Sequence, residues 1–240
     1  MSEYMDKKKR HVYIWSKTFE ENNAVFLAEY AIYNNFKTAI IAVQEDDTLS
    51  KEKSLLMNYC AENGDVWFMF GNNKMMLEKA PLAGIEKTMK QYDGFKPKGI
   101  HLDIEPHTFA EWDTDKQKLI NQYLEFVGKV STYCRLNNLE LAVSIPPHYG
   151  PEVVDKLLAL TDKIYFMCYE NVKTDYLVNK LTTYVDNGLD KLVIALRTED
   201  FANRIEMENK INELEKLTGI TNFAYHDLRR MISFDRKSIE

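Results

Sequence analysis

One stretch of the chain, residues 99–107, alternates apolar and ionisable side chains and then reaches a proline. Successive side chains of a β-strand point to opposite faces, so His101, Asp103 and Glu105 would share one face. Two carboxyl groups this close in a low-dielectric cleft cannot both ionise easily, so the pKa of one should rise. A raised carboxyl pKa suits a general acid at neutral pH. The pattern predicts acid–base chemistry. Glu105, nearer the carboxyl end of the strand and so nearer the mouth of the cleft, is expected to be the acid, with Asp103 as its partner.

The elements that must position these residues follow from the rest of the chain. Short runs rich in β-branched and aromatic residues alternate with longer helical patterns. A repeat of about 30 residues in strict β-then-α order predicts a single (β/α)8 TIM barrel. An open doubly wound sheet is the alternative, but no Gly-x-Gly-x-x-Gly follows the first strand. The expected strands are 11–16, 38–43, 66–70, 99–104, 140–145, 163–169, 191–196 and 222–226. The expected helices are 20–35, 49–63, 82–92, 115–137, 152–160, 175–187 and 199–218, with a short helix after 227.

In such a barrel the catalytic residues lie at the carboxyl ends of the strands, so other strand ends supply further candidates. By parity within 163–169, Tyr169 and Met167 face the interior, with Tyr169 at the inner mouth as a hydrogen-bond donor. A structural alternative for the carboxyl pair is a polar layer in the barrel interior or a salt bridge to Arg197. The rings of Trp15, Trp67 and Trp112, at or just past strand ends, could stack on sugar faces, and the alternative for them is ordinary core packing. The candidates for contacting a substrate are Trp15, His101, His148, Met167, Glu170, Arg197 and Tyr225.

Length and composition set broad limits. The 240 residues suit one barrel domain over 1–240, with a polar tail at 1–10. The net charge of -6 offers no basic surface for nucleic acid. The three cysteines are far apart in the chain, which disfavours a disulfide framework or a cysteine-rich zinc site.

No apolar stretch follows the basic residues near the start, so a cytoplasmic location is expected, with export as the alternative for a trimmed chain. No run approaches the ~18 apolar residues of a membrane span.

Two of the expected strand ends resemble motifs of the family 18 glycoside hydrolases, the chitinases and endo-N-acetylglucosaminidases. Residues 103–105 (Asp-Ile-Glu) are similar to the end of the family's fourth-strand motif Asp-x-x-Asp-x-Asp-x-Glu, and residues 167–170 (Met-Cys-Tyr-Glu) to its sixth-strand Met-x-Tyr-Asp. The resemblance implies an enzyme that hydrolyses an oligosaccharide or polysaccharide containing 2-acetamido sugars, without cofactor or metal ion. It implies that Glu105 protonates the glycosidic oxygen, Asp103 orients the 2-acetamido group, and Tyr169 hydrogen-bonds its carbonyl. In this substrate-assisted scheme no enzyme nucleophile is required.

The chain departs from the family pattern at other positions. The two outer acids of the fourth-strand motif are Lys98 and His101, and Glu170 replaces the aspartate after the tyrosine. The third strand ends without the family's Ser-x-Gly-Gly, and residues 225–226 (Tyr-His) stand where the family has a tryptophan that floors the sugar site.

Two other functions therefore stay open. The first is a metal-dependent barrel lyase, isomerase or hydrolase with His101, Asp103 and Glu105 as ligands, a site that His148, Glu170 or His226 could complete. The second is a barrel that binds carbohydrate but no longer cleaves it. A phosphate-handling barrel is disfavoured because no glycine-rich turn follows the last two strands.

Overall fold

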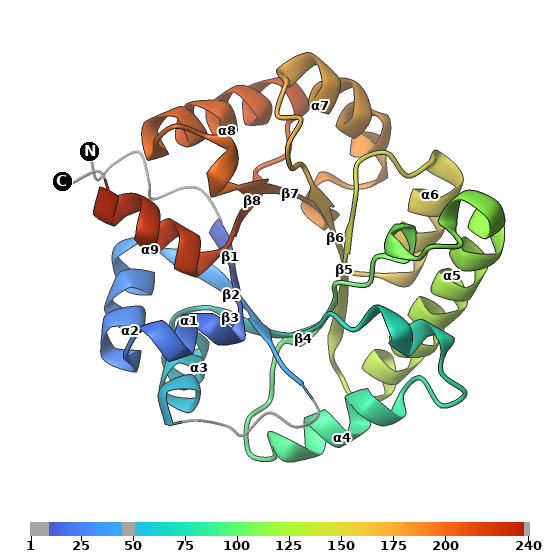
Figure 1. Cartoon of the computed structure of the whole chain (residues 1–240), viewed down its shortest axis with the longest axis horizontal. Helices are drawn as coiled ribbons and strands as arrows, with labels where there is room; N and C mark the ends of the chain where they lie inside the picture. The colour runs from blue at the N-terminus through green and yellow to red at the C-terminus, as the bar shows by residue number, and fades with distance from the viewer. Residues whose placement is uncertain (1–9, 45–50, 238–240) are drawn as a thin grey trace.

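Eight parallel strands close into a barrel in a computed structural model that describes residues 10–44 and 51–237. Each strand pairs with the next along the chain, and β8 pairs with β1. The helices form a ring around the strands (Figure 1). The predicted (β/α)8 barrel is confirmed, and the open sheet is excluded. The strands are β1 (Arg10–Ile14), β2 (Phe36–Ala42), β3 (Asp65–Phe70), β4 (Gly99–Leu102), β5 (Glu140–Ile145), β6 (Lys163–Met167), β7 (Leu192–Arg197) and β8 (Asn222–His226).

The helices follow the predicted pattern with two divisions and several shifted ends. The expected helix 175–187 is an α-helix only to Leu181 and continues as a 3-10 helix over Thr182–Asn187. The first two residues of the expected helix 49–63 lie outside the described residues. The expected helix 20–35 is two helices, because the Asn23 side chain accepts a hydrogen bond from Phe26 N at 2.9 Å and caps the second one. The expected helix 199–218 begins only at Arg204, after a similar cap by Asn203. The helices are α1 (Ser16–Glu21), α2 (Ala24–Tyr33), α3 (Lys51–Asn63), α4 (Ala83–Gln91), α5 (Trp112–Leu136), α6 (Pro151–Leu160), α7 (Thr174–Leu181), α8 (Arg204–Thr218) and α9 (Leu228–Lys237).

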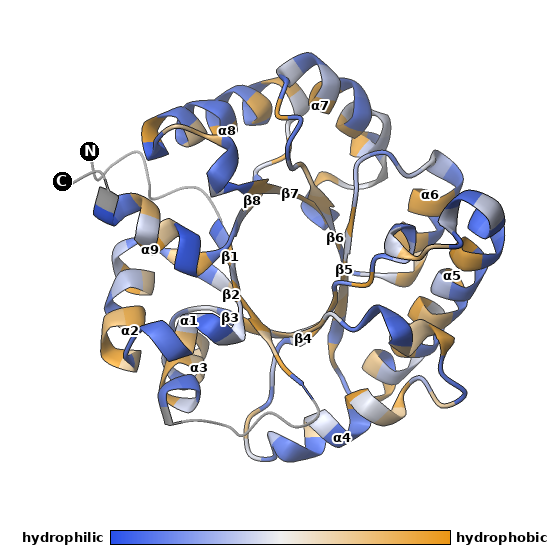
Figure 2. Cartoon of the chain, in the orientation of Figure 1, coloured by the Kyte–Doolittle hydropathy of each residue, from blue (hydrophilic) through white to orange (hydrophobic). Residues whose placement is uncertain are grey.

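The core has two layers, one on each side of the barrel wall. The larger layer lies between strands and helices and includes Ile100, Leu102 and Ile104, as the alternation in β4 predicts. The smaller layer fills the barrel interior with inward side chains such as Tyr13 and Trp67. Figure 2 shows apolar and polar residues interleaved along the ring helices, as expected where one helix face packs on the strands. The barrel is thus a packed core, not a pore.

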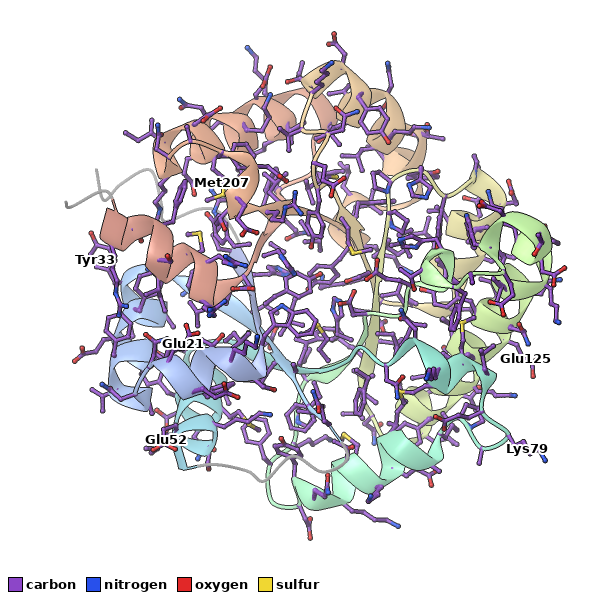
Figure 3. The ribbon with its side chains drawn as sticks, in the orientation of Figure 1. Glu21, Tyr33, Glu52, Lys79, Glu125 and Met207 are labelled. Atoms are coloured by element: carbon purple, nitrogen blue, oxygen red, sulfur yellow. The ribbon has the colours of Figure 1, made fainter. Side chains whose placement is uncertain are left out.

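Side chains occupy the centre of the barrel as well as its circumference (Figure 3). Tyr33 and Glu125 project from the outer edge of the ring, and Met207 of α8 lies inward and is fully buried. Among the described residues, no helix is both long enough and apolar enough to cross a membrane.

The predicted N-terminal tail at 1–10 needs one correction. Residues 1–9 lie outside the described residues, but Arg10 is the first residue of β1 and is buried. Its guanidinium pairs with the Glu208 carboxylate at 2.8 Å. A buried arginine requires such a partner, so Arg10 belongs to the barrel.

Candidate active site

The carboxyl end of β4 presents two acidic side chains to the barrel mouth. Strand β4 ends at Leu102, but Asp103 N still donates to Phe70 O at 2.9 Å, so the extended backbone continues. Ile104 is buried among the residues under the helices. Because neighbours on an extended chain point to opposite sides, Asp103 and Glu105 face the mouth, as the sequence predicts.

Asp103 is the carboxyl group whose pKa is raised. Burial is the main cause, and the charge of Glu105 adds to it, so the pKa rises to about 7. The Ser144 hydroxyl and His107 oppose this rise. Asp103 Oδ1 is buried and has no hydrogen-bond partner within the described part of the chain. The raised pKa that the sequence predicts for one member of the pair belongs to the deeper carboxyl, Asp103, because depth removes it from water.

His101 lies one layer below Asp103 and is completely buried. Its Nε2 lies 2.7 Å from Ser144 Oγ, and the Tyr13 hydroxyl lies 2.9 Å from the same oxygen. Burial, with a smaller effect of His11, lowers the pKa of His101 to about 3, so the imidazole is neutral at ordinary pH. The prediction that His101 contacts a substrate is corrected, because a side chain with 0% exposure beneath the mouth cannot reach one.

The predicted metal alternative required His101, Asp103 and Glu105 to converge. Within residues 10–44 and 51–237, no three His, Cys, Asp or Glu side chains are arranged to hold a metal ion. His101 instead turns to Ser144, in the buried layer. The donor geometry of the described residues therefore does not favour a metal centre at this position.

The loop after β3 and the segment after β4 hold Glu105 in place. Asn73 Oδ1 accepts a hydrogen bond from Glu105 N at 2.7 Å, and Asn73 Nδ2 donates to Thr108 Oγ1 at 2.9 Å. His107 Nε2 lies 3.2 Å from Glu105 Oε2, and its Nδ1 lies 3.2 Å from the Tyr149 hydroxyl. The sequence predictions did not include Asn73, His107 or Tyr149. For His107 the only available signal was its position two residues after Glu105.

Aromatic rings surround the mouth on the opposite side. The His226 ring lies 5.1 Å from the Tyr169 ring and 6.1 Å from the Trp15 ring, between centroids. Tyr13 is 5.6 Å from the same imidazole. Burial, followed by the charge of Asp103, raises the pKa of Tyr169 well above its ordinary value. The Tyr169 hydroxyl therefore keeps its proton and can donate a hydrogen bond, and Trp15 borders the same space.

The prediction for Tyr225 needs correction. Tyr225 is buried in the layer outside the barrel, where its hydroxyl donates to the Glu208 carboxylate and its ring packs on Phe36. The next residue, His226, takes the inward position at the mouth. The sequence analysis named His226 only as a possible metal ligand and chose Tyr225 for the substrate site, because either face of β8 ends in an aromatic or imidazole ring.

The other predicted residues lie around the rim. Arg197 donates to Asp200 Oδ1 at 2.7 Å, and its guanidinium lies 6.0 Å from the Tyr169 ring centroid. Glu170 lies further out: its side chain is 81% exposed and its Oε1 is 3.8 Å from Arg197 Nη1. His148 is exposed on the loop after β5, with its ring 5.8 Å from that of His107.

Met167, the last residue of β6, is half-buried, two positions beyond the inward-facing Tyr165. It therefore faces the interior, as the parity of the sequence predicts.

A cavity of about 540 Å³ opens beside the mouth. Trp15, Met69 and Gly71 line it, together with uncharged residues of β2, β3 and α4. A Cβ atom at Gly71 would lie 3.8 Å from Asp103 O and 3.9 Å from the Trp15 ring. The cavity is therefore contiguous with the carboxyl end of β4. Those of its lining residues that the structure describes are uncharged, which suits an uncharged group.

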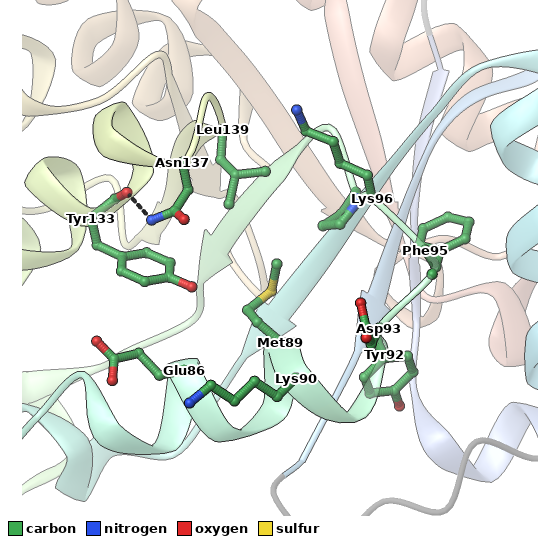
Figure 4. Close-up of a pocket in the computed structure, with 12 residues that line it drawn as sticks. Glu86, Met89, Lys90, Tyr92, Asp93, Phe95, Lys96, Tyr133, Asn137 and Leu139 are labelled. Atoms are coloured by element: carbon green, nitrogen blue, oxygen red, sulfur yellow. Dashed lines mark hydrogen bonds between the residues drawn. The ribbon is translucent and has the colours of Figure 1, made fainter.

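A larger cleft of about 770 Å³ lies at the other end of the barrel, between α4 and α5. Figure 4 shows Glu86, Lys90 and Tyr133 at this cleft, with Asn137 donating to the Tyr133 carbonyl at 2.9 Å. None of the residues at the ends of β4, β6 or β8 lines it.

Three solved structures illustrate what the chain is similar to. The spore cortex-lytic enzyme SleL of Bacillus cereus matches with a TM-score of 0.63 at 11% identity, over 92% of this chain and 71% of that one. The chitinase of Chromobacterium violaceum matches with a TM-score of 0.61 at 13% identity, over 92% and 94%. A Group IV chitinase of Ostrinia furnacalis, solved with allosamidin, matches with a TM-score of 0.58 at 14% identity, over 80% and 66%.

By sequence, no protein-family model and no curated protein matches the chain. The identities to the solved structures are low, so the likeness is one of fold. The chain therefore shares the barrel fold of the chitinases and spore cortex-lytic enzymes.

Proposed function

We propose that the protein is a glycoside hydrolase that cleaves an oligosaccharide or polysaccharide containing 2-acetamido sugars. The observation that carries the proposal is the pair of carboxyl groups at successive inward positions beyond β4, with the pKa of Asp103 raised to about 7 and the protonated Tyr169 hydroxyl across the same mouth. The similarity in fold to chitinases and to a cortex-lytic enzyme supports the substrate class.

In the first step Glu105 gives its proton to the glycosidic oxygen while the bond from that oxygen to the anomeric carbon breaks. The carbonyl oxygen of the substrate's own 2-acetamido group forms the new bond to the anomeric carbon. With a pKa raised to about 7, Asp103 is largely a carboxylate only above neutral pH. In that form it accepts a hydrogen bond from the acetamido N–H and offsets the positive charge that develops there. Tyr169 donates to the carbonyl oxygen and fixes its direction of attack. This is the substrate-assisted scheme, in which two carboxyl groups serve without a covalent enzyme intermediate.

In the second step water attacks the anomeric carbon, and Glu105, now a carboxylate, accepts the proton from that water. The bond to the acetamido oxygen breaks, and the acetamido group and Glu105 return to their starting states. The Glu105 side chain is 32% exposed, so water can reach it. Trp15 at the edge of the site offers an apolar ring face for a sugar.

A second candidate function is a barrel that binds these sugars without cleaving them. It is favoured by one observation: at the position of an outer acid of the family motif, the chain has the fully buried, neutral His101. Asp103 therefore has an imidazole beneath it where the family has a carboxyl group.

The test compares hydrolysis of aryl 2-acetamido glycosides and 2-acetamido oligosaccharides by the parent, Glu105→Gln and Asp103→Asn, each with and without a chelator. We expect cleavage that survives the chelator and falls at least ~100-fold in Glu105→Gln. Glu125→Gln, which removes an exposed carboxylate on the outside of α5, is the matched control and should leave the rate unchanged. Saturable binding by the parent with no cleavage would instead establish the binding barrel. Loss of cleavage with the chelator would contradict the scheme.

A further inference from the structure

A histidine contacts the proposed acid from within the same loop. His107 belongs to η2 (Pro106–Thr108), which begins directly after Glu105. Its Nε2 lies 3.2 Å from Glu105 Oε2. Thr108 N and Thr108 Oγ1 both donate to Glu105 O, at 3.0 and 2.8 Å, so the backbone turns tightly at this point. The imidazole therefore reaches the carboxylate through a turn of fixed shape.

The His107 ring is held by aromatic neighbours. It meets Trp112, Tyr149 and His148 edge-to-face, with interplanar angles of 74°, 86° and 85°. Trp112 and Tyr149 stack on each other with an interplanar angle of 20°. Rings in such contacts lose rotational freedom, and edge-to-face pairs are favourable arrangements. The imidazole is consequently oriented by packing before any substrate arrives.

The hydrogen bond to Tyr149 indicates which nitrogen of His107 carries the proton. Burial, followed by the charge of Glu105, raises the pKa of Tyr149 well above its ordinary value, so this hydroxyl keeps its proton. The hydroxyl lies 3.2 Å from His107 Nδ1 and can donate to it. A neutral imidazole that accepts at Nδ1 carries its proton on Nε2, which faces Glu105. The other titratable groups nearby are His148 and Lys116, whose ammonium lies 5.1 Å from the Trp112 ring centroid.

We propose that His107 is a positioning residue for Glu105, with Tyr149 selecting its tautomer. The Nε2–H donates to Glu105 Oε2 and leaves Oε1 as the oxygen that carries the proton for the glycosidic bond. After proton transfer the same hydrogen bond stabilises the carboxylate that later accepts a proton from water. The inference rests on the proposed function, since it assigns a partner to the same acid.

The kinetic test separates the hydrogen bond from the shape of the side chain. His107→Phe keeps a ring without a donor. We expect kcat to fall about 10–100-fold with KM changed less than about 3-fold, because the lost hydrogen bond orients the acid and does not hold the substrate. His107→Gln places an amide N–H near the position of Nε2 and should recover most of the lost rate. Tyr149→Phe alone should lower kcat about 3–10-fold. The double variant Tyr149→Phe/His107→Phe should be little slower than His107→Phe, because both residues act through the same contact with Glu105. Tyr133→Phe, which removes a tyrosine hydroxyl at the remote cleft, is the control.

A spectroscopic test does not depend on turnover. Side-chain ¹⁵N spectra of the neutral imidazole in the parent should show His107 as the Nε2–H tautomer, and Tyr149→Phe should shift the population towards a mixture. An Nδ1–H tautomer in the parent, or a His107→Phe variant with the parent's kcat, would overturn the proposal. If the parent cleaves no substrate, the proposed function fails, while the tautomer spectrum still decides whether His107 donates to Glu105. If Glu105→Gln is inactive but His107→Phe is not, the function stands and the positioning role fails.

Discussion

The side-chain oxygen of Asn73 accepts a hydrogen bond from the backbone N–H of Glu105 at 2.7 Å. The two residues lie on loops that follow neighbouring strands, β3 and β4. Strand pairing continues only to Asp103, and Pro106 next to Glu105 has no N–H. This bond therefore fixes the backbone at the proposed acid together with the two hydrogen bonds that Thr108 donates to Glu105 O. The position of Glu105 thus depends on a side chain from a different βα unit.

Replacing Asn73 should affect catalysis more than an ordinary loop substitution. Asn73→Ala leaves the Glu105 N–H without its partner and frees Thr108, so we expect kcat to fall about tenfold and the free energy of unfolding to fall by about 1 kcal/mol. Steady-state kinetics and urea unfolding measure both. Asn137→Ala removes an amide that donates to Tyr133 O at the far end of the barrel, and should change stability only. Equal kcat values for both variants would show that Asn73 does not position Glu105.

Asp103 should make the protein less stable as the pH rises. Its pKa in the folded state is about 7, against an ordinary value of 3.8, so the folded state binds this proton more tightly than the unfolded state does. Its contribution to stability therefore falls between about pH 4 and pH 7 and then levels off. Asp103→Asn should be more stable than the parent by about 1–3 kcal/mol at pH 8, allowing for its partial contact with solvent. The difference should shrink towards zero at pH 4. Urea unfolding at several pH values tests this, and a difference independent of pH would contradict it.

His101 should produce the opposite dependence at acid pH. Its pKa falls from an ordinary 6.5 to about 3 on folding, so the unfolded state takes up the proton first. The contribution of His101 to stability is complete above pH 6.5 and is lost as the pH falls towards 3, by up to about 1.4 kcal/mol per pH unit. His101→Asn removes the titrating group, so the slope of its stability against pH should be shallower than the parent's below pH 6. Identical slopes would show that His101 is accessible to protons in the folded protein.

Tyr225 should matter for stability and not for hydrolysis. Its hydroxyl donates to Glu208 outside the barrel wall, next to the Arg10–Glu208 ion pair. Tyr225→Phe should lower the free energy of unfolding by about 1 kcal/mol and leave kcat/KM unchanged. Thermal unfolding and hydrolysis of the same substrate panel test the two parts. A loss of hydrolysis in a fully folded Tyr225→Phe variant would show that Tyr225 takes part in the substrate site.

The sequence by itself determined the barrel and the two carboxyl groups at its mouth. Both follow from local periodicity: alternation in an extended chain decides which side chains share a face, and the β-then-α order decides the architecture. The same parity placed Tyr169 at the mouth and Ile104 under the helices. These features need no knowledge of which segments meet.

Only the tertiary structure decided the rest, because it depends on contacts between distant segments and on depth. Asn73 reaches Glu105 from the neighbouring βα unit, and Tyr149 meets His107 only when the ends of β4 and β5 are adjacent. The register between β7 and β8 places Arg197 opposite His226. The raised pKa fell on Asp103 because burial, which no local pattern measures, outweighs position along the strand.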